Sequence, residues 1–141
     1  MNIEHCRMAY FLETDFEKIN HLLNFYYCYM PSYGSGLNNL IKLEKILYRA
    51  TIVSPEKIPP TIVTLNSAVT LIDIKTGAEM YFTLSLPSPA DSTTKRISLF
   101  STFGCAVIGC RTGDVIEVEI PEGRKRFFVT NITNAIVDTA A

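Results

Sequence analysis

Residues 114–132 have the sequence DVIEVEIPEGRKRFFVTNI, and this stretch decides the fold class. In its first half, apolar residues alternate with the acidic residues Glu117 and Glu119. Such alternation is typical of a β-strand that buries one face and exposes the other. The proline and glycine within residues 121–124 predict a turn. Residues 125–132 are again strand-like, so the stretch predicts a β-hairpin.

Further strands are predicted toward the N-terminus by short segments rich in Val, Ile, Thr, Leu and aromatic residues. They lie at residues 8–12, 61–65, 68–74, 79–86 and 97–100. Residues 87–95 are polar and contain two prolines, which predicts a loop. The apolar segment 105–109 is bounded by glycines and fits either a buried strand or a short helix.

Two helices are predicted in the first third of the chain. Thr14, followed three residues later by Glu17, forms a capping-box signature for a helix over residues 15–29. One proline and two glycines within residues 30–36 end this helix. Apolar residues then recur at helical spacing over residues 37–50.

These helices predict an antiparallel hairpin ahead of a β-rich domain. Each helix has about 15 residues, so the hairpin is about 20 Å long. Ser54 and Pro55 are a helix-start signal, but the prolines that follow stop the helix after one turn. We place a domain boundary here, giving an N-terminal unit 1–53 and a C-terminal unit 54–141 of an α+β protein.

The composition excludes several classes of protein. A net charge of −1 disfavours strong direct binding of nucleic acid, which usually requires a basic excess. No apolar run approaches the ~20 residues of a membrane-spanning helix. The N-terminus has acidic residues around a short apolar patch, which is unlike a secretory signal. We therefore expect a cytoplasmic protein. The four cysteines match no zinc pattern and are expected to be reduced and mostly buried.

No catalytic constellation is visible in the sequence. His5 and His21 are interpreted as surface or packing residues, and Glu117 and Glu119 as a solvent-exposed strand face. No phosphate-loop motif is present. We therefore expect no catalytic residue, no metal and no cofactor, and the protein is predicted not to be an enzyme.

Two groups of side chains are candidate contacts for a partner. The first is the hairpin tip with Tyr29, Met30 and Tyr33, where aromatic residues either bind a partner or pack the hairpin's own loop. The second is the basic triplet 124–126, which fits a soluble strand edge as well as a partner contact.

Four segments in the same order resemble the C-terminal domain of the Gre transcript-cleavage factors and of Rnk, the regulator of nucleoside diphosphate kinase. They are VSPEKIP at residues 53–59, VTLNSAV at 63–69, ISLFSTFGCAVIG at 97–109, and RTGDV at 111–115 followed by IPEG at 120–123. The resemblance implies an FKBP-like β-domain with a short helix at residues 105–110. In this family the C-terminal domain docks on RNA polymerase near its secondary channel.

By carry-over from the family, docking on core RNA polymerase is expected around five residues. They are Asp91, Ser98, Ser101, Phe103 and Gly104. A polar, glycine-containing corner of a rigid domain is a common place for binding loops. Phe103 fits equally well as a residue that caps the core.

The chain departs from the Gre pattern at the hairpin tip. In Gre factors, acidic tip residues help to hold a catalytic metal. Residues 30–36 contain no Asp or Glu, although Mg²⁺ requires oxygen ligands such as carboxylates. This absence and the short hairpin resemble Rnk and predict a regulator without transcript-cleavage activity. A second departure is Thr102, where the family often has proline.

Two alternative functions remain from the sequence. As the name Rnk suggests, the chain could be an adaptor for another protein such as nucleoside diphosphate kinase, with the hairpin aromatics as its contact. The FKBP-like fold also suggests a peptidyl-prolyl isomerase, but fold does not carry function.

Overall fold

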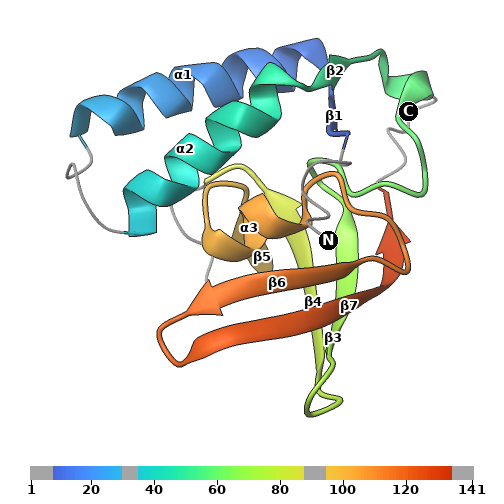
Figure 1. Ribbon diagram of the computed structural model, residues 1–141. Coiled ribbons are helices and arrows are strands. Elements are labelled where there is room, and N and C mark those ends of the chain that lie inside the picture. The colour runs from blue at the N-terminus through green and yellow to red at the C-terminus, as the bar shows by residue number, and fades with distance from the viewer. Residues whose placement is uncertain (1–7, 30–34, 88–94, 135–141) are drawn as a thin grey trace.

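The computed structural model describes residues 8–29, 35–87 and 95–134 and has an α+β architecture (Figure 1). Its helices are α1 (Glu13–Tyr29), α2 (Ser35–Tyr48), the short 3₁₀ helix η2 (Pro55–Lys57) and α3 (Thr102–Val107). Its strands are β1 (Tyr10–Phe11), β2 (Thr51–Ile52), β3 (Ala68–Asp73), β4 (Glu79–Ser85), β5 (Arg96–Ser98), β6 (Val115–Ile120) and β7 (Gly123–Thr133). None of these helices has the length and apolarity that a membrane crossing requires.

Five strands form one sheet in the order β5-β4-β3-β7-β6, and a two-stranded parallel pair joins β1 to β2. The predicted hairpin is confirmed, because Ile120 pairs with Gly123 across a turn of two residues. The alternation of β6 is confirmed as well, since Ile116 and Val118 are buried and the acidic residues are exposed. On the exposed face, Arg124 and Arg126 form ion pairs with Glu117 at 3.4 and 3.3 Å. Lys125, between them, lies 3.8 Å from the Asp73 carboxylate, so each residue of the basic triplet has an acidic partner on the sheet.

The helical hairpin of α1 and α2 lies over the sheet, with α3 between α2 and the strands (Figure 1). Both helices contribute fully buried side chains, such as Ile19 and Leu43, to the same apolar cluster as Leu71 and Phe82 of the sheet. The two regions therefore share one core. The boundary between residues 53 and 54 stays a prediction.

Several predicted element boundaries differ from the structure. The first helix begins at Glu13 and the second at Ser35, each two residues earlier than predicted. Of the two alternatives for the segment 105–109, the structure has a helix, which covers Thr102–Val107 and begins there because the Ser101 hydroxyl accepts the backbone N–H of Gly104 at 3.1 Å. From the sequence, Ser98 and Ser101 are expected docking residues, and this cap is not predicted.

The predicted strand at residues 61–65 is wrong. Only Ile62 makes a bridge, to Arg111. The chain then turns, because the buried Ser67 hydroxyl accepts the N–H of Thr64 at 2.8 Å and Asn66 adopts a left-handed φ of 74°. Asn66 is one of the residue types that tolerate this conformation. Val63 still bonds to the backbone of Gly109 and Cys110, whereas at Thr64 a side-chain hydrogen bond takes the place of a ladder bond.

Gly104 allows α3 to lie directly against the strand that precedes it. A Cβ atom at this position would be 2.0 Å from the carbonyl oxygen of Ser98 and 2.8 Å from the Cα of Leu99. Both are backbone atoms, which cannot move aside as a flexible side chain would. The glycine therefore sets the distance between α3 and the end of β5.

We expect Leu43→Ala to lower the free energy of unfolding by about 2–5 kcal/mol, because it leaves a cavity at a fully buried position. Helical and sheet signals should be lost in one transition, since the hairpin and the sheet share a core. Urea denaturation followed by circular dichroism and by tyrosine fluorescence tests this. The matched control is Ile41→Ala on the same helix, which is 39% exposed and should cost less than ~0.5 kcal/mol. Loss of the helical signal at a lower urea concentration than the sheet signal would contradict a shared core.

We expect Gly104→Ala to destabilise the protein by more than the ~1–3 kcal/mol usual for overpacking, because the added methyl group meets backbone atoms. The control is Gly77→Ala, where a Cβ has open space and only the left-handed φ of 76° costs about 1–2 kcal/mol. Urea denaturation of both variants gives the comparison. Equal stability of the two variants would show that the approach of α3 to Ser98 is not tight.

Candidate functional site: the corner at residues 98–104

The corner at residues 98–104 joins the end of β5 to the start of α3, and its backbone is fixed by serine side chains. The Ser101 hydroxyl donates to the carbonyl of Ser98 at 2.7 Å, and the Ser98 hydroxyl accepts the N–H of Phe100 at 3.0 Å. The N–H of Ser101 also donates to the Ser98 carbonyl, at 3.0 Å. These bonds connect neighbouring residues, so the corner is a rigid turn.

The structure brings together four of the five residues expected to bind a partner. Ser98, Ser101 and Phe103 are half-buried, whereas Gly104 is buried. Gly104 thus shapes the corner and offers little surface to a partner. The ring of Phe103 packs edge-on against that of Phe127 with centroids 5.3 Å apart, so this side chain also contributes to the core. Asp91 lies outside the described residues.

The end of α1 presents exposed aromatic side chains. Tyr29 is 75% exposed and Phe25 54%, and their ring centroids are 4.7 Å apart. Met30 and Tyr33 of the predicted hairpin tip lie outside the described residues. Tyr27 instead links the two helices, donating its hydroxyl to the Glu44 carboxylate at 3.1 Å. Partial burial, this hydrogen bond and the adjacent negative charge raise the pKa of the Tyr27 phenol.

The hairpin contacts the corner directly, which sequence reasoning did not anticipate. The Asn39 side chain of α2 donates to the Thr102 hydroxyl at 3.2 Å, and the Cys105 thiol lies 3.6 Å from the Asn39 carbonyl. The ring of Tyr26 on α1 meets that of Phe100 at 5.1 Å, nearly perpendicular. The aromatic run around Tyr26 was a signal in the sequence, whereas nothing marked Asn39.

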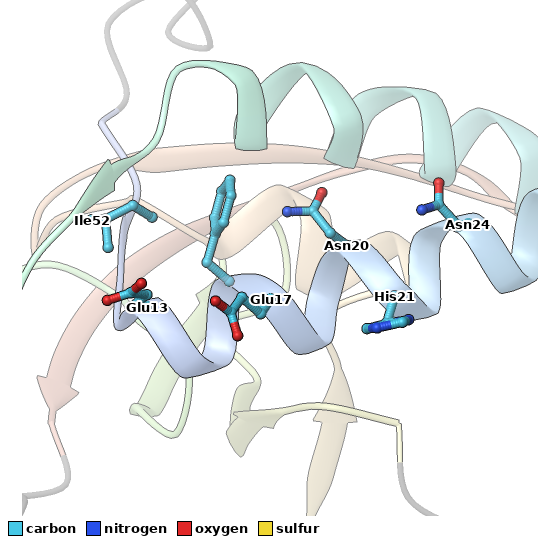
Figure 2. Close-up of a pocket in the computed structure, with 7 residues that line it drawn as sticks. Glu13, Glu17, Asn20, His21, Asn24 and Ile52 are labelled. Atoms are coloured by element: carbon cyan, nitrogen blue, oxygen red, sulfur yellow. The ribbon is translucent and has the colours of Figure 1, made fainter.

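A shallow hollow lies along the outer face of α1, shown in Figure 2. Glu13, Glu17 and His21 follow one another at intervals of one turn, and Asn20 and Asn24 form a parallel row. Two apolar side chains, Phe16 and Ile52, complete the lining. Residues 8–29, 35–87 and 95–134 contain no group of three or more His, Cys, Asp or Glu side chains that could hold a metal ion. The hollow is a solvated helix face with mixed polarity.

The described cysteines have different environments. Of the three cysteines in the described residues, Cys105 and Cys110 are buried, in line with the expectation that the thiols are mostly buried, whereas Cys28 on α1 is exposed. The buried thiols lie near backbone carbonyls, with Cys105 Sγ 3.2 Å from the Leu99 oxygen and Cys110 Sγ 3.4 Å from the Ala106 oxygen.

Known proteins resemble this chain in sequence, and one solved structure also resembles it in fold. The chain is 32% identical over 96 residues to the transcription elongation factor GreA of Clostridium beijerinckii and 35% identical over 92 residues to that of Alkaliphilus oremlandii. The matches cover 68% and 65% of this chain but only 60% and 58% of those relatives. The solved structure of a prokaryotic transcription elongation factor GreA/GreB from Nitrosomonas europaea is 31% identical, with a TM-score of 0.70, and the match covers 90% of this chain and 98% of that one.

A family model described as "Transcription elongation factor, GreA/GreB, C-term" matches residues 58–134. The match includes the corner at residues 98–104, both strands of the β6–β7 hairpin and the turn at Asn66. Since it covers more than half of the chain, this protein belongs to the GreA/GreB family of transcription elongation factors through the C-terminal domain that defines it.

Proposed function

We propose that this protein binds core RNA polymerase at the site that Gre factors use, near the secondary channel, with the corner at residues 98–104 as the docking element. The observation that carries this proposal is the rigid, partly exposed corner within the domain that the GreA/GreB family model matches. A protein that binds RNA polymerase at this site would be cytoplasmic, as is also expected from the sequence.

The geometry of the corner suits docking. The Ser98 and Ser101 side chains are bonded locally and half-buried, so binding would order few additional groups. A surface that is already ordered loses less conformational entropy on association. Phe103 adds a half-buried aromatic ring held by Phe127, the kind of anchor that is enriched at interfaces.

We further propose that the protein does not stimulate transcript cleavage and is not itself an enzyme. The support is chemical, because residues 30–34, between α1 and α2, and the first two residues of α2 contain no carboxylate that could hold Mg²⁺. The likeness to Rnk, a role with nucleoside diphosphate kinase and prolyl isomerase activity stay predictions from the sequence. None of the relatives reported above carries a name that refers to them.

The docking proposal predicts saturable binding of the purified chain to core RNA polymerase and displacement by a Gre factor. Ser101→Asp should weaken this binding at least tenfold, because it places a charge in the interface. Ser101→Asn is the matched control, since Asn and Asp are both good helix caps and only Asp adds charge. Lys75→Glu, in the turn between β3 and β4 and far from the corner, should leave binding unchanged (Figure 1).

The measurement is the affinity of each variant for core RNA polymerase immobilised on a surface, with and without a Gre factor as competitor. If the chain does not bind, or binds without displacement, the shared site is wrong. If the two Ser101 variants bind equally well, the docking element lies elsewhere on the domain.

The proposal of a non-cleaving regulator predicts the result of a cleavage assay on stalled elongation complexes. The chain alone should leave the rate of transcript cleavage at its basal value, because it supplies no carboxylate at the tip. Added in excess to a Gre-stimulated reaction, it should lower the rate by occupying the site. Gel analysis of labelled transcripts gives both rates. Stimulation of cleavage by the chain alone would refute the proposal.

A further inference from the structure

Two directional contacts connect the hairpin to the corner. One is the hydrogen bond from the Asn39 amide to the Thr102 hydroxyl at 3.2 Å. The other is the edge-on ring contact between Tyr26 and Phe100, with centroids 5.1 Å apart and planes at 68°. The first contact begins on α2 and the second on α1, so each helix is tied separately to the corner.

The apolar layer beneath the helices attaches the hairpin by close packing, and the two directional contacts add to this constraint on its direction. Its buried members, such as Leu23 on α1 and Leu40 on α2, contribute through the hydrophobic effect, which is proportional to buried area and not directional. A hydrogen bond weakens steeply when its angle changes, and an edge-on aromatic pair also has a preferred geometry. Both directional contacts therefore restrict rotation of the hairpin over the sheet.

The positions of these contacts matter for the exposed aromatics. Tyr26 follows Phe25 in the chain, and the ring of Phe25 contacts that of Tyr29 in a tilted arrangement at the end of α1. Asn39 lies in the second turn of α2. Both contacts thus lie in the half of the hairpin nearest the loop between the helices. The exposed rings lie in this half too, so a small rotation of the hairpin about its other end would displace them most.

We propose that Asn39, Thr102, Tyr26 and Phe100 are positioning residues that fix the direction of the hairpin, so that hairpin and corner meet a partner as one rigid surface. The fixed direction concerns this chain alone, whereas the shared surface rests on the proposed binding of RNA polymerase. A hairpin held in this way cannot swing outward on its own, and its aromatic end stays beside the corner. Because hairpin and corner are already ordered relative to each other, a partner that contacts both loses less conformational entropy on binding.

The test measures the direction of the hairpin without any partner. One spin label is attached to Cys28, which is exposed on α1, and a second to Lys75→Cys in the turn between β3 and β4, while Cys6 is replaced by Ser. Cys105 and Cys110 are buried, and buried thiols react slowly with labelling reagents. Pulsed electron paramagnetic resonance then gives the distribution of distances between the labels.

The variant is Asn39→Ala combined with Tyr26→Leu. We expect the distribution to broaden or become bimodal, because both directional contacts are lost while the apolar layer remains. The matched control is Asn38→Ala combined with Tyr48→Leu, since Asn38 is the exposed neighbour of Asn39 and Tyr48 is 91% exposed. Thermal unfolding of both proteins establishes that they are folded. A distribution as narrow in the variant as in the control overturns the positioning role.

The same pair of proteins is then compared for affinity to core RNA polymerase. We expect the variant to bind roughly tenfold more weakly than the control, as for the loss of a pre-ordered surface. A broader distance distribution with unchanged affinity would overturn the shared rigid surface while leaving the positioning role in place. If neither the parent nor the control binds polymerase, the proposed function and the shared surface both fail, and the distance measurement alone still decides the positioning role.

Discussion

The close approach of α3 to the end of β5 is the constraint on which the arrangement of this protein depends. Gly104 leaves room for the carbonyl of Ser98 where any side chain would collide with it. Because α3 lies so low against the strand, its other side can receive α2, and the hairpin closes over it. One missing methyl group thus allows three layers to share a single apolar core.

The serine bonds and the glycine make the corner both a structural joint and a candidate binding element. Ser101 caps α3 and is bonded to Ser98, so the same hydroxyl that starts the helix also shapes the surface. The structural role and the proposed binding role therefore overlap at this corner. Substitutions that keep the cap while changing charge are needed to separate them, because simple truncation would disturb both.

The hairpin packs on the β-domain and contacts the corner, so it does not project from the domain as a separate rod. Ile19, Leu23 and Leu43 are buried, so the hairpin is a layer of the protein along much of its length. Its exposed part is the aromatic end with Phe25 and Tyr29. If the protein acts at the polymerase channel, it acts through a compact body with this aromatic end held beside the corner.

The sequence by itself determined the local elements that have a strong periodic signal. The β6–β7 hairpin followed from alternation and turn residues, and the two long helices followed from apolar spacing and a break at residues 30–36. The resemblance in the motif at 97–109 also indicated the short helix and the family to which the domain belongs. These features depend on neighbouring residues, which the sequence displays directly.

Only the tertiary structure decided which distant residues meet. Residues 61–65 had a strand composition but formed one isolated bridge at Ile62, and the chain turns at Asn66, where Ser67 accepts the Thr64 N–H. The meeting of Asn39 with Thr102, 63 positions apart, depends on how α2 packs on α3. No local pattern reports such a contact, since its geometry is set by the combined packing of the glycine, the apolar layer and the sheet.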